Sequence, residues 1–386
     1  MSLSKKRLAR MHDVLAGHVE RGGVPGIVSL IRHRGEVHVD VIGERVRRDT
    51  IFRISSMTKP ITAVAAMILV EECRVRLGDP VDELLPELAD RRVLGKIDGP
   101  LDDTVPAHRA ITVRDLLTFR MGFGQLPMAP DSYPILRAAN ERDIGMGPPN
   151  PAATPPPDEW LRRLGELPLM CQPGEKWLYH TGSDALGVLI ARASGRPLED
   201  FLRERVFEPL GMTDTAFSVP AGKRDRFVTS HWTDGTVYDE VDGRWSSPPA
   251  FPSGGGGLVS TADDYLAFGQ MMLANGRHGD ERLLSRPSVE LMTTDQLTTV
   301  QKAVSGFFPG YFDGRGWGFG VSVITRRDEV CAVPGRFGWD GGLGTSWFSD
   351  PREDLVAILL TQRAGFPLFS PVCLDFWTSV YQAIDD

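Results

Sequence analysis

Ser56 and Lys59 are the two residues whose types and spacing best suit nucleophilic chemistry in this 386-residue chain. They lead into 61–70, a run that is apolar except for Thr62 and that predicts a helix buried on all sides. If this helix begins near Ser56, both side chains lie on one face of its first turn, so the amine can reach the hydroxyl. Burial lowers the pKa of an ammonium group, and a neutral lysine can take a proton from serine. The pair therefore predicts a serine nucleophile with a lysine partner.

The spacing alone does not identify this site, because Ser2 and Lys5 repeat it in a polar terminus where no buried site is expected. The context favours Ser56. Pro60 is tolerated in a first helical turn, since the N–H group that it lacks would have no helical partner there. The free backbone N–H groups at a helix start can also receive an oxyanion. The start of this helix is therefore the better candidate for chemistry in which an oxyanion develops.

The elements that would position this helix come from both ends of the chain. Two β-rich runs, 26–32 and 36–42, are separated by an Arg-Gly pair and predict a hairpin. Short β-like runs recur later, at 318–325, 344–348 and 355–361. Amphipathic or closing helices are expected at 4–21 and 371–383. Strands at both ends with helices between them predict an α+β fold in which the two chain ends share one sheet.

The same pattern suggests one catalytic unit, 1–386, made of two parts. Residues of about 1–75 and 250–386 would form the α/β part, and about 76–249 a mainly helical part. Within the second part, 121–158 is rich in proline and small residues. A loop region this long is usually functional, and we interpret it as a wall of the substrate pocket, with a merely solvent-exposed loop as the alternative.

Further helical patterns lie in the middle of the chain, at 111–117, 184–193, 197–206 and 262–274. Thr112 suits the N-cap of the first, and Ser260 or Thr261 that of the last. Just before it, 252–257 contains four consecutive glycines. No Lys-Ser/Thr pair follows them and no dinucleotide fingerprint is present, so we expect a tight, close-packed turn and not a phosphate site.

The composition excludes several classes of function. A net charge of −8 with scattered Lys and Arg offers no basic field for nucleic acid. No apolar run reaches membrane-spanning length, and the charged first residues lack a signal-peptide pattern, so a cytoplasmic location is expected unless a leader has been removed. The sequence shows no metal motif and predicts no cofactor. Four distant cysteines predict reduced thiols: Cys73, Cys171, Cys331 and Cys373.

Three short motifs give the chain a family resemblance: Ser56-x-x-Lys59, Tyr179-x-Thr181 and Trp339-x-Gly341. In this order they resemble the three motifs of the serine β-lactamase and penicillin-binding-protein superfamily, and most closely the family VIII carboxylesterases. Other segments look like family segments in the same order: 116–122, 207–212, and 255–261 with Asp264. The resemblance covers most of the chain. It implies the β-lactamase/transpeptidase fold, with an antiparallel sheet flanked by helices.

The resemblance also implies the roles of the site residues. Ser56 would be the nucleophile, with Lys59 and Tyr179 sharing its deprotonation and each depressing the pKa of the other; which of the two is the base stays open. The oxyanion would sit between the backbone N–H groups of Ser56 and Gly342. His180, in a variable position, is expected to be an exposed or packing residue. The substrate pocket is expected to include Trp339, Asp340, Gly341, Thr181 and Phe123.

Two departures from the β-lactamase pattern concern the substrate. Thr181 stands where β-lactamases have asparagine, and Trp339-Asp340 replaces the lysine-threonine of their third motif. That lysine provides the positive charge that attracts the carboxylate of penicillins, whereas an acid should repel it. We therefore expect small neutral or apolar acyl substrates.

The sequence thus predicts a carboxylesterase-like serine hydrolase that works through an acyl-enzyme on a small ester or amide. No G-x-S-x-G elbow is present, so an α/β-hydrolase is not indicated. The alternatives are a β-lactamase, a D-amino-acid amidase or peptidase, an acyltransferase and, from another class, a non-catalytic scaffold. The sequence does not indicate the oligomeric state.

Overall fold

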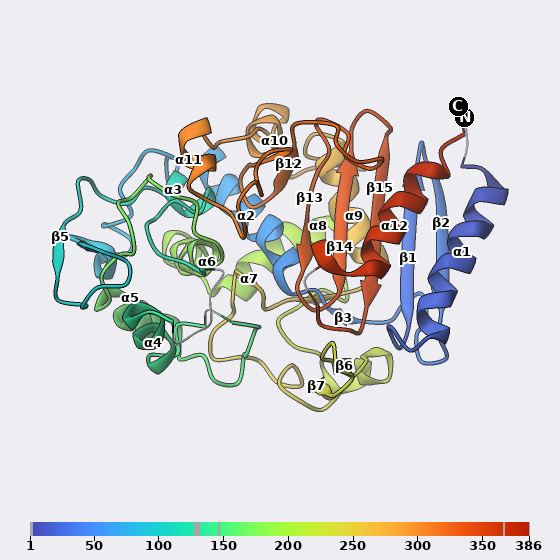
Figure 1. Cartoon of the computed structure of the whole chain (residues 1–386), viewed down its shortest axis with the longest axis horizontal. Coiled ribbons are helices and arrows are strands. Elements are labelled where there is room, and N and C mark those ends of the chain that lie inside the picture. The colour runs from blue at the N-terminus through green and yellow to red at the C-terminus, as the bar shows by residue number, and fades with distance from the viewer. Residues whose placement is uncertain (1–2, 127–131, 146, 366, 386) are drawn as a thin grey trace.

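The computed structural model describes residues 3–126, 132–145, 147–365 and 367–385. Its main feature is a seven-stranded sheet with the order β11-β12-β13-β14-β15-β1-β2, in which all neighbours are antiparallel. The strands are β1 Ile27–His33, β2 Glu36–Ile42, β11 Arg315–Trp317, β12 Ser322–Ile324, β13 Phe337–Gly341, β14 Thr345–Asp350 and β15 Leu355–Thr361. N-terminal and C-terminal strands lie side by side at the right of Figure 1. The prediction of one antiparallel sheet built from both chain ends is confirmed.

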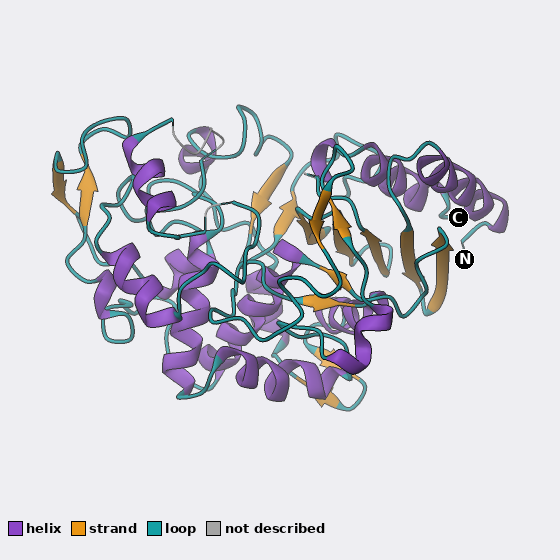
Figure 2. Ribbon diagram, turned by 90° about the horizontal axis from the view of Figure 1, so that it is seen from below, coloured by secondary structure: helices purple, strands orange, loops and turns teal. Residues whose placement is uncertain are grey.

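Helices cover both faces of this sheet (Figure 2). On one face, α1 (Lys5–Glu20) and α12 (Pro371–Gln382) pack against Ile31 and Leu359. On the other, α9 (Ala262–Leu273) packs in a cluster with Leu30 and Ile358. Successive side chains of a strand point to opposite faces, so a strand buried on both sides can be apolar without alternation. This agrees with the apolar run 355–360 of β15, a strand that is buried along its whole length.

The remaining helices lie mostly in the left half and the middle of Figure 1. They are α2 Thr58–Glu71, α3 Val113–Leu117, α4 Pro134–Glu141, α5 Pro157–Gly165, α6 Thr181–Ser194, α7 Leu198–Leu202, α8 Glu208–Leu210, α10 Arg286–Met292 and α11 Thr299–Ala303. Four short two-stranded ribbons complete the fold: β3 Phe52–Arg53 with β8 Val259–Ser260, β4 Arg92–Leu94 with β5 Thr104–Pro106, β6 Ser230–His231 with β7 Val237–Asp239, and β9 Arg277–His278 with β10 Glu281–Arg282.

Helix α2 is the central helix that its apolar sequence predicts. Every residue from Thr58 to Leu69 is buried, and α6 packs along it. A helix that is buried on all sides is stabilised mainly by the removal of its apolar side chains from water. Lys59 is buried at the start of this helix, with 1% of its surface exposed.

The helix caps agree with the sequence patterns. The Thr112 side chain accepts a hydrogen bond from the Asp115 N–H, and the Asp115 carboxylate accepts one from the Thr112 N–H, which makes a capping box. At α9 the N-cap is Thr261 and not Ser260.

One predicted strand was too long. The expected run 318–325 contains only β12, because residues before it turn at Gly320, which has a φ of +71°. A Cβ atom there would lie 2.8 Å from the carbonyl oxygen of Lys59, so the turn must approach α2 without a side chain.

The four cysteines are free thiols, as expected. Within the described ranges, no helix combines the length and the apolar character needed to cross a membrane.

Candidate active site

Ser56 lies in the lining of a cavity of about 630 Å³ between the start of α2, the end of β13 and several loops. The loop region 121–158 contributes Gln125, Leu126 and 147–149 to this lining, which supports its interpretation as a pocket wall; residues 127–131 and 146 of that region lie outside the described residues. Gly342, the predicted second oxyanion donor, lines the same cavity. The predicted nucleophile and both predicted oxyanion residues therefore face one space.

The backbone around Ser56 is held tightly. A 3-10 turn, Ser55–Met57, precedes α2, so helical structure begins where the sequence predicts. Ser55 has a φ of +46°, a left-handed conformation that is uncommon outside glycine. The carbonyl oxygen of Ile54 accepts a hydrogen bond from Thr345 Oγ1, and a Cβ atom on Gly341 would collide with that same carbonyl. Glycine at 341 thus allows β13 to pack directly against the segment that leads into Ser56.

Lys59 reaches Ser56 as the spacing predicts, with 3.0 Å between Nζ and the serine Oγ. Its Nζ also lies 3.1 Å from His180 Nδ1, donates to the carbonyl oxygen of Gly255, and sits 4.5 Å from the centre of the Tyr179 ring. Burial lowers the pKa of the Lys59 ammonium to about 7, although the charge of Asp184 acts in the opposite direction. A substantial fraction of the lysine is therefore neutral near pH 7.

Tyr179 lines the same cavity as Ser56. Its hydroxyl is in hydrogen-bonding contact with Ser56 and accepts a hydrogen bond of 2.7 Å from Trp339 Nε1. Burial raises the pKa of the Tyr179 phenol despite these hydrogen bonds. The expectation that Lys59 and Tyr179 depress each other's pKa is therefore wrong for Tyr179, whose pKa is raised. The pKa of Lys59 is lowered as expected, but its cause is burial, which favours the neutral form of both groups.

His180 is neither exposed nor a plain packing residue. Only 9% of its surface is accessible, and its ring lies between Lys59 and the carboxylate of Asp184, which is 3.1 Å from Nε2. Sequence reasoning missed this contact. The predicted helix begins only at Asp184, and His180 lies before it with a non-helical φ of 83° and ψ of −67°, so helical periodicity gave no signal of this contact.

The glycine-rich segment 252–257 is the close-packed turn that its sequence predicts. A Cβ atom on Gly254 would lie 2.6 Å from the carbonyl oxygen of Ser183. The turn is also part of the site, because the next residue, Gly255, accepts a hydrogen bond from Lys59 through its carbonyl oxygen. Backbone groups carry no sequence signature, so this contact was not predicted.

The predicted pocket residues divide into two groups. Trp339 and Asp340 line the cavity, whereas Gly341, Thr181 and Phe123 do not. Phe123 is fully buried in the main hydrophobic core, and Thr181 is buried in the first turn of α6. Gly341 faces the Ile54 backbone, as described above.

The walls of the cavity are mostly apolar. Aromatic side chains that line it are Tyr179, Trp232, Phe307, Phe308, Trp339 and Phe369. Among the described lining residues there is no lysine or arginine, and Asp340 is the one carboxylate. Burial raises the pKa of Asp340, and its carboxylate accepts a hydrogen bond from Ser346 Oγ. The cavity thus offers an anionic ligand no positive side chain in its lining.

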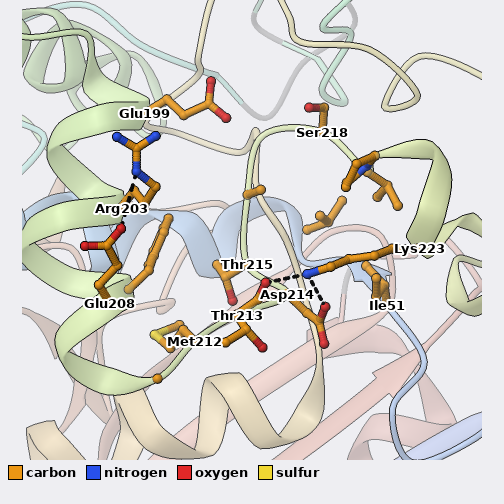
Figure 3. Close-up of a pocket in the computed structure, with 16 residues that line it drawn as sticks. Ile51, Glu199, Arg203, Glu208, Met212, Thr213, Asp214, Thr215, Ser218 and Lys223 are labelled. Carbon is orange, nitrogen blue, oxygen red and sulfur yellow. Dashed lines mark hydrogen bonds and ion pairs between the residues drawn. The ribbon is translucent and has the colours of Figure 1, made fainter.

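A second cavity, of about 480 Å³, lies beside α7 and α8 (Figure 3). Two ion pairs lie within it: Lys223 Nζ lies 2.7 Å from the Asp214 carboxylate, and Arg203 Nε lies 3.5 Å from that of Glu208. The carboxylate of Glu199 also lines it. It contains no serine next to a buried base and is a weaker candidate. Across the part of the chain that the structure describes, no three His, Cys, Asp or Glu residues gather closely enough to hold a metal ion.

Comparisons with known proteins identify the family of this chain. The family model described as Beta-lactamase matches residues 11–377. Protein Rv1367c of Mycobacterium tuberculosis is 40% identical over 362 residues, which cover 89% of this chain and 87% of the relative. Esterase EstB of Burkholderia gladioli is 29% identical over 409 residues, which cover 97% of this chain and 95% of the relative. The solved structure of EstCE1, a hydrolase with promiscuous acyltransferase activity, has the same fold, with a TM-score of 0.78 and 24% sequence identity. The match covers 97% of this chain and 99% of the EstCE1 chain. The chain therefore belongs to the beta-lactamase family.

Proposed function

We propose that this protein hydrolyses carboxylic esters of small neutral or apolar acyl groups through an acyl-enzyme on Ser56. One observation carries the proposal. A serine in contact with a buried lysine whose pKa is lowered to about 7 opens into a cavity with aromatic walls and no positive side chain among its described lining residues. Such a cavity favours an apolar acyl group, and its described lining residues offer a penicillin-like carboxylate no lysine or arginine.

In the acylation step, neutral Lys59 takes the proton of Ser56 as the serine Oγ attacks the ester carbonyl carbon. Negative charge develops on the carbonyl oxygen, where the N–H groups of Ser56 and Gly342 would stabilise it. When the C–O bond to the alcohol breaks, the alkoxide takes a proton from the Tyr179 hydroxyl or the Lys59 ammonium. Because burial raises the pKa of Tyr179, the phenol holds a proton to give, and Lys59 is the better initial base.

Deacylation repeats these transfers with water in place of serine. A water molecule attacks the acyl carbon, loses a proton to the Lys59 and Tyr179 pair, and the bond to Ser56 Oγ breaks. Ser56 recovers its proton and the carboxylic acid leaves. An acyltransferase would follow the same course with an alcohol as the attacking group.

The rate should depend on pH through Lys59. The protonated lysine has no lone pair, so we expect kcat/KM to fall below the lysine pKa of about 7 and to reach a plateau above it. The measurement is kcat/KM for p-nitrophenyl butyrate from about pH 5 to 9, corrected for hydrolysis without enzyme. A profile that stays flat down to about pH 5 would show that no group with this pKa serves as the base.

The ester preference is tested by comparing p-nitrophenyl butyrate with nitrocefin on one enzyme preparation, with Ser56→Ala as the blank. We expect ester turnover at least ~100-fold faster in kcat/KM than nitrocefin turnover, since no lining cation attracts the β-lactam carboxylate. Comparable or faster nitrocefin cleavage would favour a β-lactamase.

A further inference from the structure

The backbone of His180 is strained. This residue has φ 83° and ψ −67°, and the N–H of Thr181 donates to the carbonyl oxygen of Tyr179 at 3.2 Å, so His180 is the central residue of a γ-turn with positive φ. This turn is rare because a side chain at positive φ is crowded. Such strain persists only where surrounding contacts hold it, and it is common at functional sites. The contacts of the His180 side chain show what holds it.

Asp184 determines which nitrogen of His180 carries the proton. One carboxylate oxygen, Oδ1, accepts hydrogen bonds from Ser253 Oγ at 2.7 Å and from the Gly255 N–H at 2.9 Å. The other, Oδ2, lies 3.1 Å from His180 Nε2. Burial raises the pKa of Asp184, but the His180 ring and these hydrogen bonds outweigh it and lower the pKa overall. An ionised carboxylate can only accept, so Nε2 must carry the hydrogen and Nδ1 the lone pair.

That lone pair points at Lys59. A neutral lysine amine has two N–H groups and one lone pair. Two acceptors other than the serine surround Nζ: His180 Nδ1 and the carbonyl oxygen of Gly255. When both N–H groups are used by these acceptors, the amine lone pair is left to face Ser56 Oγ, 3.0 Å away.

We propose that His180, with its tautomer set by Asp184, is a positioning residue that directs the lone pair of neutral Lys59 at the Ser56 hydroxyl. The inference rests on the proposed function, because it concerns the base of that reaction. The proposal extends the Ser, Lys and Tyr of the motifs by two residues, His180 and Asp184. Hydrogen bonds then run from Ser56 through Lys59 and His180 to Asp184.

The groups that face His180 support a neutral ring. The charged ones are Lys59 from α2 and Asp184 from α6, while the turn 253–257 contributes the uncharged Ser253 and Gly255. Burial lowers the pKa of His180, and the charge of Lys59 lowers it further. The form of His180 that accepts from Lys59 therefore persists below the usual pKa of histidine.

Asp184→Asn tests the proposal because it reverses the tautomer. The amide oxygen can keep the bonds from Ser253 and Gly255, which turns the NH₂ group toward His180 Nε2. Nε2 must then accept, so Nδ1 carries the hydrogen and donates to the lone pair of Lys59, diverting it from Ser56. We expect the high-pH plateau of kcat to fall ~100-fold for p-nitrophenyl butyrate, with KM changed less than ~3-fold.

A purely electrostatic role of Asp184 predicts a different result. Removing its negative charge would lower the pKa of Lys59 further, since that charge raises it in the native protein. The acid limb of the rate profile would then move to lower pH with the plateau unchanged. An unchanged plateau in Asp184→Asn overturns the positioning role.

A second variant and a control complete the test. His180→Phe keeps a ring but removes the acceptor, so its plateau should fall as in Asp184→Asn, and the double variant should lose little more. Asp40→Asn disturbs a surface pair, in which the Asp40 carboxylate lies 3.0 Å from His12 Nδ1, and should leave the plateau unchanged. A double variant that shows the product of the two losses would overturn the proposal.

A spectroscopic measurement tests the tautomer without relying on activity. In ¹⁵N NMR of the labelled protein, His180 should change from the Nε2–H to the Nδ1–H form in Asp184→Asn. The same tautomer in both proteins would overturn the proposal. Failure of the proposed function is a separate outcome, in which wild-type ester turnover is absent or survives in Ser56→Ala. A wild type that depends on Ser56 but tolerates Asp184→Asn rejects only the positioning role.

Discussion

Ser56→Ala will abolish acyl-enzyme formation and lower kcat/KM for p-nitrophenyl butyrate by at least ~10⁴-fold. Alanine has no oxygen to attack the ester. Neither Lys59 nor Tyr179 can take over as nucleophile, because each group is engaged in hydrogen bonds beside position 56. Intact-protein mass spectrometry after rapid acid quenching will show a butyryl adduct in the wild type and none in the variant.

The control for this experiment is Ser218→Ala, which removes a hydroxyl from the second cavity (Figure 3) and should keep full activity. Thermal unfolding should be similar in both variants, since neither change opens a large cavity in the core. Near-normal ester turnover by Ser56→Ala would remove Ser56 from the mechanism.

Lys59→Met and Tyr179→Phe will each lower kcat/KM by ~10²- to 10⁴-fold, and the double variant will lose less than the product of the two. Both groups contact the same serine hydroxyl, and the lysine Nζ lies 4.5 Å from the tyrosine ring, so they handle one proton as a unit. Methionine suits the buried position of Lys59, because it fills much of the volume without placing a charge there. The measurement is kcat/KM of the wild type, both single variants and the double variant.

A matched control for the tyrosine variant is Tyr381→Phe. Tyr381 is another buried tyrosine and lies in α12, on the face of the sheet covered by the terminal helices. Its hydroxyl donates a hydrogen bond of 2.7 Å to the carboxylate of Asp350 in β14. Loss of this hydrogen bond in Tyr381→Phe should lower the free energy of unfolding and leave kcat/KM nearly unchanged. If the losses of Lys59→Met and Tyr179→Phe multiply in the double variant, the two groups act independently and the shared role is wrong.

Local sequence patterns were sufficient for the elements that carry the site. The apolar run 61–70 predicts a buried helix because burial on all sides requires apolar residues on all sides. The hairpin of β1 and β2 and the strand β15 follow from β-rich runs bounded by turn residues. The spacing of Ser56 and Lys59 predicts their contact because both lie in one helical turn. The three motifs in order indicated the family.

Contacts between distant segments were decided by the tertiary structure. Lys59 meets His180 across 121 positions of the chain and Gly255 across 196, and Trp339 donates to Tyr179 across 160. Periodicity reports which face of an element is buried, but not which atom of another element will lie opposite a given donor.

The same limit explains the pocket residues that were misplaced. Phe123 and Thr181 lie close in sequence to residues that line the cavity, Gln125 and His180, yet neither lines it. Phe123 is buried in the main hydrophobic core, and Thr181 is buried in the first turn of α6. The sequence therefore determined the family, the central helix and the reactive pair, because these depend on local spacing and composition. The partners of Lys59 and the lining of the cavity depend on directional contacts that exist only once the sheet, α2 and α6 have packed together.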